Sequence, residues 1–132
     1  MLVYKQTTHD IEVQVQPTYL KQHSNATEDL YVWAYEIEIA NHGNEAVRLM
    51  TRHWRITNAH GQMLEVRGAG VVGDQPLIRP GEMYSYTSFT NLATSSGFML
   101  GTYEVVTEGG ATLRVAIPAF SLDGPTRPQL MH

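Results

Sequence analysis

The residues best suited to chemistry in this 132-residue chain are glycines and arginines in its middle third. Gly68, Gly70 and Gly73 match the GxGxxG spacing with which dinucleotide-binding proteins hold a pyrophosphate at the start of a helix. Here Pro76 and Pro80 follow too closely for a helix, because proline lacks the backbone donor that a helix interior needs. The acidic residue expected about twenty positions later for the ribose is also missing. The motif therefore does not predict a dinucleotide-binding unit.

The same glycines could form an anion site with nearby arginines. Consecutive backbone amides in a glycine-rich loop can form a concave nest, and an arginine fork can clamp a phosphate or carboxylate. If their strand lies beside the loop, this arrangement predicts binding of pyrophosphate-like or nucleotide anions. The alternative is that the glycines only supply the positive φ angles of a tight loop and the arginines face solvent. The candidate anion-binding residues are Arg52, Arg55, Arg67, Gly68, Gly70 and Gly73.

Other residue types give no signature of a metal site or a catalytic centre. The six histidines are scattered, with no pair at a spacing that puts two imidazoles on one face. Glu36 and Glu38 share one face of an expected strand and could offer oxygen ligands to magnesium, but a solvated sheet face is the favoured interpretation. A Gly-x-Ser-x-Gly elbow and cysteine are both absent. We expect no cofactor, no bound metal and no enzymatic activity.

Composition predicts one globular domain. A chain of this length buries about two-thirds of its unfolded surface, so it needs no crosslink. The lack of cysteine fits a reducing compartment, and the N-terminal apolar segment is too short for a signal peptide or a membrane span, so we expect a cytoplasmic protein that does not contact membranes. A net charge of −4 leaves no basic excess for nucleic acid. Residues 46–82 differ from the rest, with five arginines against three acidic residues.

The dominant hydrophobic period is two, which is typical of strands with one buried face. In the clearest strand, residues 33–40, large apolar side chains occupy every second position. The buried parity changes between Val47 and Trp54, which predicts a β-bulge near Arg52 and His53. For residues 82–91 the pattern does not decide which face is buried.

These segments predict an all-β fold. Seven or eight short antiparallel strands separated by glycine, proline and asparagine turns are typical of a β-sandwich of immunoglobulin-like or fibronectin type III-like form, and a small closed barrel is the competing architecture. A glycine turn at residues 108–110 predicts a C-terminal hairpin. We expect an ordered core over about residues 9–122, with loose ends at residues 1–9 and 123–132.

Several ordered motifs resemble those of the bacterial ApaG family. They extend over nearly the whole chain, which implies a single ApaG domain at residues 1–132, and they include Trp33-Ala-Tyr-Glu-Ile, Arg52-His-Trp-Arg-Ile-Thr, Val66-Arg-Gly-Ala-Gly-Val-Val-Gly and Gly97-Phe-Met-Leu-Gly-Thr-Tyr. The resemblance implies a fibronectin-like β-sandwich, a gene beside a diadenosine tetraphosphate hydrolase, and a genetic link to cobalt resistance and magnesium efflux. Related domains occur in eukaryotic F-box and polymerase-interacting proteins. No shared chemistry comes with the family.

Two functions follow as alternatives. The first is a non-enzymatic protein-interaction or regulatory module, linked by the resemblance to magnesium and cobalt homeostasis, whose partner is an unknown protein or a second copy. The second is a sensor that binds pyrophosphate or nucleotide-like anions at the glycine-rich loop and Arg55. An enzyme acting on dinucleoside polyphosphates is a distant third. A buried Trp54 with Arg55 over a donor-lined hollow would favour the sensor, whereas an exposed apolar patch would favour the interface.

Overall fold

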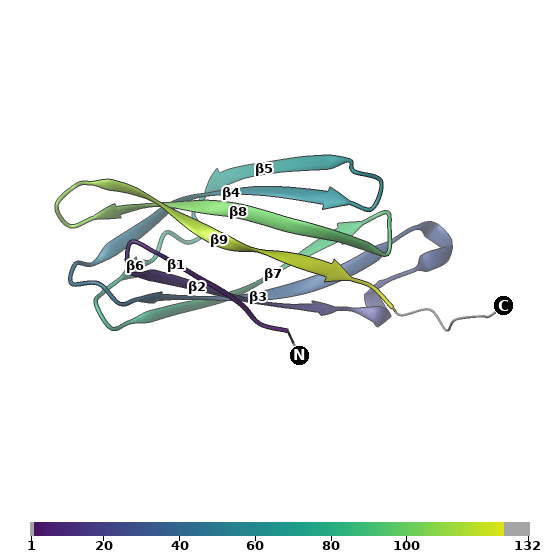
Figure 1. Cartoon of the computed structure of the whole chain (residues 1–132), viewed down its shortest axis with the longest axis horizontal. Helices are drawn as coiled ribbons and strands as arrows, with labels where there is room; N and C mark the ends of the chain where they lie inside the picture. The colour runs from purple at the N-terminus through teal and green to yellow at the C-terminus, as the bar shows by residue number, and fades with distance from the viewer. Residues whose placement is uncertain (1, 126–132) are drawn as a thin grey trace.

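In the computed structural model, which describes residues 2–125, two antiparallel β-sheets stack face to face (Figure 1). The first sheet has the order β1-β2-β3-β7 and consists of β1 (Tyr4–Thr8), β2 (Ile11–Tyr19), β3 (Tyr31–Asn41) and β7 (Met83–Leu92). The second has the order β5-β4-β8-β9 and consists of β5 (Met63–Ala69), β4 (Val47–Asn58), β8 (Ser96–Thr107) and β9 (Thr112–Asp123), with β6 (Leu77–Ile78) paired to β4. Two 3₁₀ turns, Lys21–His23 and Ala26–Glu28, link β2 to β3.

The predicted β-sandwich and C-terminal hairpin are therefore confirmed. The competing closed barrel is not formed, because no strand pairing joins the two sheets within the described residues. The finer assignment to an immunoglobulin-like or fibronectin-like type stays a prediction. No helix of residues 2–125 has the length and hydropathy to cross a membrane.

The core lies between the sheets and is centred on aromatic side chains from both. The ring of Trp54 on β4 stacks edge-on against Tyr35 of β3 at 5.5 Å between centroids and against Phe120 of β9 at 5.9 Å. All three rings are buried. The alternation that predicted strand β3 places its large apolar residues here, since one face of each sheet must be removed from water.

A β-bulge in β4 changes which side chains face the core. The register with β8 pairs Leu49 with Val105 and Thr51 with Glu104, so Met50 is the extra residue. Both Leu49 and Trp54 are consequently buried. The predicted change of parity is confirmed, although the bulge precedes the predicted position at Arg52 and His53.

Strand β7 settles the face that the sequence pattern left open. Tyr84 and Tyr86 are half-buried on the core side, whereas Met83 and Phe89 are exposed on the outer side. The sequence pattern is ambiguous because both faces of this strand carry large side chains, and because the buried face carries tyrosines, whose hydroxyls make them less apolar than the exposed Met83 and Phe89. The hydroxyl of Tyr86 is hydrogen-bonded to that of Tyr103 on β8, so a polar pair spans the two sheets.

The prediction of a loose N-terminal segment is wrong for residues 4–8. They form β1, which pairs with β2 along its whole length and lies beside β9. Two side chains of β1 accept hydrogen bonds from β9: Thr8 Oγ1 from the amide of Ala116 at 3.3 Å and Tyr4 Oη from the amide of Ser121 at 3.4 Å. At the other end Asp123 still belongs to β9, and residues 126–132 lie outside the described part of the chain.

Candidate functional site

The glycine-rich segment follows β5 and makes a tight turn. Gly70 has a φ of +63° and Gly73 a φ of +79°, both in the left-handed region that glycine tolerates. Its backbone amides are used within the protein: Gly70 donates to the carbonyl of Met50 at 2.7 Å, and Val71 and Asp74 donate to each other's carbonyls at 2.8 and 2.9 Å. These amides do not point to a common centre where an anion could sit, which favours the interpretation of the glycines as turn formers.

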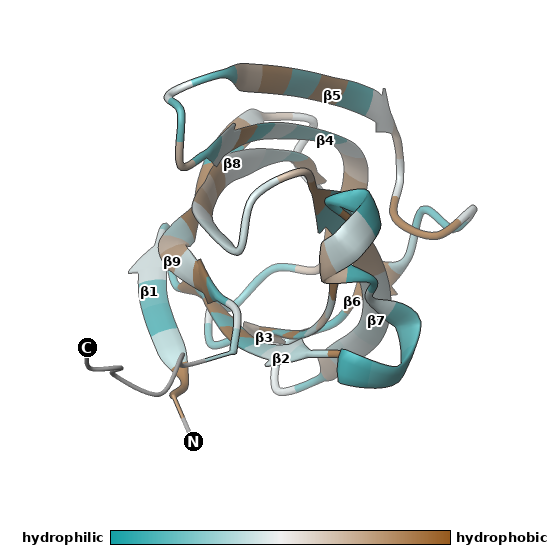
Figure 2. Cartoon of the chain, turned by 90° about the vertical axis from the view of Figure 1, so that its right-hand side faces the viewer, coloured by the Kyte–Doolittle hydropathy of each residue, from teal (hydrophilic) through white to brown (hydrophobic). Residues whose placement is uncertain are grey.

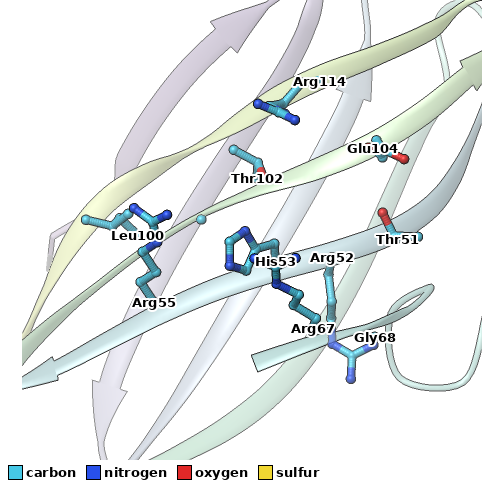
Figure 3. Close-up of a pocket in the computed structure, with 11 residues that line it drawn as sticks. Thr51, Arg52, His53, Arg55, Arg67, Gly68, Leu100, Thr102, Glu104 and Arg114 are labelled. Atoms are coloured by element: carbon cyan, nitrogen blue, oxygen red, sulfur yellow. The ribbon is translucent and has the colours of Figure 1, made fainter. Parts of the chain in front are cut away.

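Arg52 lies beneath this turn as a structural brace. Its Nη1 donates to the carbonyls of Ala69 at 3.1 Å and Gly70 at 2.9 Å. The side chain leaves the opposite side of the sheet from His53 and Arg55, because β-strand side chains alternate (Figure 3). Arg52 therefore satisfies the carbonyls of the turn through Nη1, and its side chain is separated by the sheet from those of His53 and Arg55.

Arg55 and Arg67 do converge, on the outer surface of the second sheet. The register places His53 of β4 directly opposite Arg67 of β5, and Arg55 two residues along the same strand face. Together with Arg114 of β9 they line an open hollow of about 650 Å³ (Figure 3). Of the six predicted anion-binding residues, Arg55 and Arg67 line this hollow from the outer face. Arg52 and Gly68 also border it, although the guanidinium of Arg52 is bonded to the turn on the other side of the sheet, whereas Gly70 and Gly73 do not.

One carboxylate is shared by a histidine and two arginines of this surface. Glu65 Oε2 lies 2.6 Å from His53 Nε2, 3.4 Å from Arg67 Nη2 and 4.0 Å from Arg55 Nε. The hydrogen bonds from His53 and then Arg67 hold the pKa of the Glu65 carboxyl below its ordinary value. The single negative charge of Glu65 cannot neutralise both Arg55 and Arg67, so this part of the surface keeps a positive character.

An apolar strip borders the cations at one end of the sheet. Met63 of β5 and Phe98 of β8 both lie in register with Thr57 of β4, and their side chains are 54% and 43% exposed. Leu100 is in register with Arg55, so apolar and cationic side chains meet. We call this surface the β4–β8 face and define it by His53, Arg55, Met63, Glu65, Arg67, Phe98, Leu100 and Arg114.

The outer face of the first sheet has the opposite charge. Glu36 and Glu38 share this face as predicted, and Glu12 lies on the neighbouring strand β2. Glu38 Oε1 accepts a hydrogen bond from Gln14 Nε2 at 3.1 Å, and Glu12 lies 2.9 Å from His42 Nε2, whose hydrogen bond lowers the pKa of the Glu12 carboxyl. Over residues 2–125 no three His, Cys, Asp or Glu side chains are grouped to hold a metal ion.

The ApaG domain pattern matches residues 21–107, which is more than half of the chain. The chain belongs to the ApaG family. Protein ApaG of Paramagnetospirillum magneticum is 53% identical over 129 residues, which cover 97% of this chain and 99% of that protein. Protein ApaG of Rhizobium meliloti is 54% identical over 123 residues, covering 93% and 95%. The crystal structure of a Bordetella pertussis protein described as ApaA superposes with a TM-score of 0.86 at 42% identity, covering 89% of this chain and 96% of that one.

This ApaG-family sandwich has both the feature expected of an anion sensor and the feature expected of a protein-interaction module. Trp54 is buried beneath the sheet while Arg55 stands over the hollow, and an exposed apolar strip lies beside it. The sequence interpretation missed the contributions of His53 and Glu65. Strand parity could have found both, because His53 lies two residues before Arg55 and Glu65 two before Arg67.

Proposed function

We propose that this protein is a non-enzymatic interaction module whose β4–β8 face binds an acidic protein segment that carries an apolar anchor. The observation that carries the proposal is that apolar and cationic side chains share one sheet face, with the exposed Phe98 and the half-buried Leu100 in register at and beside Arg55. Arginine, methionine and aromatic residues are the types enriched at protein interfaces. Phe98 and Met63 would take the anchor, and Arg55 and Arg67 the carboxylates.

The charge of the face argues for an acidic partner. Its outward side chains include Arg55, Arg67 and Arg114, and the carboxylates beside them are Glu65 and Glu104. Arginine suits this role because its planar guanidinium can bind a carboxylate through two parallel hydrogen bonds. Complementary charge would also speed the encounter and exclude basic partners. The opposite face, with Glu36 and Glu38, would repel the same segment.

A phosphate-type anion is the second candidate ligand, and it is favoured by one observation. Arg55, Arg67 and Arg114 line the same hollow. The donors there are side chains on an exposed sheet, whereas three backbone amides of the glycine turn, those of Gly70, Val71 and Asp74, are already bonded to carbonyls of the protein. A protein segment would contact several strands at once and gain from the apolar strip as well. We therefore rank the protein ligand first.

The family link to magnesium and cobalt is accounted for by an indirect role. A partner bound at the β4–β8 face would carry the connection to cation transport, and this chain would regulate it without holding the ion or performing a reaction. The acidic face of the first sheet supports this view, because two of its carboxylates already have partners within the protein: Glu38 accepts a hydrogen bond from Gln14, and Glu12 is bonded to His42. These carboxylates are therefore poorly placed to bind a cation themselves.

The test is a selection of random displayed peptides on the purified protein. We expect enriched peptides to combine acidic residues with an aromatic or large aliphatic residue. For the tightest peptide, Arg55→Glu and Phe98→Ala should each weaken binding by about tenfold or more, as for residues central to an interface. Glu36→Gln, an exposed substitution on the opposite face, is the matched control and should leave the affinity unchanged. Failure to enrich such peptides, or equal loss in the control, would refute the proposal.

The anion alternative has its own test. Thermal unfolding is followed with and without pyrophosphate, ATP, diadenosine tetraphosphate, magnesium or cobalt. A ligand at a hundred times its dissociation constant adds about 2.7 kcal/mol to the free energy of unfolding. Stabilisation by the phosphates that disappears in Arg55→Ala would establish the hollow as an anion site. Stabilisation that persists in this variant would place the ligand elsewhere.

A further inference from the structure

Strand β5 leaves one edge of the second sheet uncovered. It is the outermost strand of that sheet, and no described strand pairs with its far side (Figure 2). Most of its residues are exposed, including Leu64 at 62%, although Leu64 lies on the side of the strand that faces the core layer. An exposed edge of this length is a template for pairing with another strand.

The backbone groups available at this edge follow from the pairing with β4. The amide of Asn58 donates to the carbonyl of Gln62 at 3.0 Å, which makes these two a hydrogen-bonded pair. Such pairs alternate along an antiparallel ladder, so every second residue after Gln62 bonds to β4, namely Leu64, Val66 and Gly68. The remaining residues of β5 direct their N–H and C=O groups to the free edge: Met63, Glu65, Arg67 and Ala69.

We infer that β5 pairs antiparallel with β5 of a second copy, with Val66 opposite Val66. In this register Glu65 lies opposite Arg67 of the second copy and Arg67 opposite its Glu65. Both of these residues direct their backbone groups to the free edge, so the two form hydrogen-bonded pairs across the junction. The backbone pattern and the side-chain charges therefore agree on one arrangement.

Neighbouring registers are disfavoured by charge. A shift by two in either direction keeps the backbone groups matched but places Glu65 opposite Glu65 or Arg67 opposite Arg67, and like charges directly opposite each other destabilise a sheet. The centred register also sets Leu64 opposite Gly68, where the absence of a side chain leaves room for the leucine. The segment is thus complementary to itself, as a two-fold symmetric interface requires.

The pairing joins the two copies into one continuous sheet. Residues opposite each other in an antiparallel ladder point to the same face, so the β4–β8 faces of both copies lie on the same side. A partner with two binding segments could engage both and gain from their effective concentration. The self-association does not require the proposed ligand, because the strands pair through the backbone of the sheet edge, although Glu65 and Arg67 belong to both the edge and the β4–β8 face.

The test measures the self-association of the full chain by sedimentation equilibrium, from about 10 μM to about 1 mM. The wild type should form a dimer. Glu65→Arg places like charges opposite each other at both ends of the centred register, and Arg67→Glu does the same with the opposite sign. Each should weaken the dimer by about tenfold. An equimolar mixture of the two variants should recover it as a heterodimer, because every opposed pair is then of opposite charge.

The mixture separates this arrangement from a general loss of folding. Circular dichroism checks that each variant is folded, and recovery in the mixture requires that both are. Phe98→Ala, which alters the β4–β8 face away from Glu65 and Arg67, should leave the dimer intact even if it abolishes peptide binding. A monomeric wild type at all concentrations, or a mixture that stays monomeric, would overturn the inference.

Discussion

Gly68 lies against the guanidinium of Arg52, so closely that a methyl carbon at Gly68 would be 2.8 Å from Nη1 of Arg52. The same guanidinium bonds the carbonyls of Ala69 and Gly70. Gly68 and Arg52, which the sequence assigns to an anion site, therefore stabilise the turn after β5. The arginines that could bind a ligand are Arg55, Arg67 and Arg114 on the other side of the same sheet.

Substitution of Gly68 should destabilise the fold without touching the outer face. Gly68→Ala forces the guanidinium of Arg52 to move and to weaken its two bonds to the turn. At about 1 kcal/mol per hydrogen bond, we expect a loss of about 1 to 2 kcal/mol in the free energy of unfolding. Gly109→Ala is the control, because a methyl group there meets its nearest atom at an ordinary 3.5 Å and should change the free energy by less than about 0.5 kcal/mol. Urea denaturation measures both, and equal losses would contradict the role of Arg52.

The aromatic centre of the core should carry a large share of the stability. Phe120 contacts Tyr4, Tyr35 and Trp54. Phe120→Ala removes these contacts and leaves a cavity, so we expect a loss of about 3 to 5 kcal/mol in urea denaturation. Phe89→Ala makes the same chemical change on a side chain that is 63% exposed, and it should cost less than about 0.5 kcal/mol. A small effect at Phe120 would mean that the two sheets are held by other contacts.

Glu65 should titrate below the ordinary glutamate pKa of about 4.3. His53 is the main cause and Arg67 the next, so His53→Gln should raise the pKa of the Glu65 carboxyl more than Arg67→Gln does. Because the folded-state pKa is lowered, the stabilisation is present above about pH 4.3 and is lost as the pH falls through the folded value. Carboxyl carbon chemical shifts followed by NMR measure the pKa. A value that neither variant changes would contradict the shared-carboxylate arrangement.

The buried tyrosines should make the protein sensitive to alkali. Burial raises the pKa of Tyr86 and of Tyr103 above the ordinary value of about 10. A raised folded-state pKa leaves stability intact below about pH 10 and lowers it above, because the unfolded chain releases protons that the folded chain retains. Each such tyrosine contributes up to about 1.4 kcal/mol per pH unit.

Tyr86→Phe tests this dependence. Urea denaturation between about pH 9 and about pH 11 should show a shallower loss of stability in the variant than in the wild type. Parallel losses would mean that Tyr86 ionises as readily in the folded protein as in the unfolded chain.

The sequence predicted the sandwich where the apolar alternation is strong. Residues 33–40 and the C-terminal hairpin are examples, because one face of each strand had to be buried. Strand β1 was missed because its central residues are polar, so it has no apolar alternation. It is held by pairing with β2 and by two of its side chains, which accept hydrogen bonds from amides of β9. Those partners are distant in sequence, so no local pattern reveals them.

The candidate site was predicted only in part for a related reason. Arg55 and Arg67 belong to one hairpin, and their convergence follows from local parity. The sequence pattern assigns Arg52 to the same anion site, but side chains alternate along β4, so Arg52 lies on the opposite side of the sheet from Arg55. Phe98 joins the face through β8, whose register with β4 depends on the bulge at Met50, and Arg114 joins it through β9, which pairs with β8. Both pairings are long-range in sequence.

The most direct test of the interaction module is to map a bound peptide by NMR. The tightest acidic peptide from the selection is titrated into the isotope-labelled protein, and amide shifts are recorded for both sheets. Binding at the β4–β8 face predicts changes concentrated around Arg55, Arg67 and Phe98, with Glu36 and Glu38 unaffected. Changes centred on the first sheet, or at the turn containing Gly70 and Gly73, would contradict the proposed function.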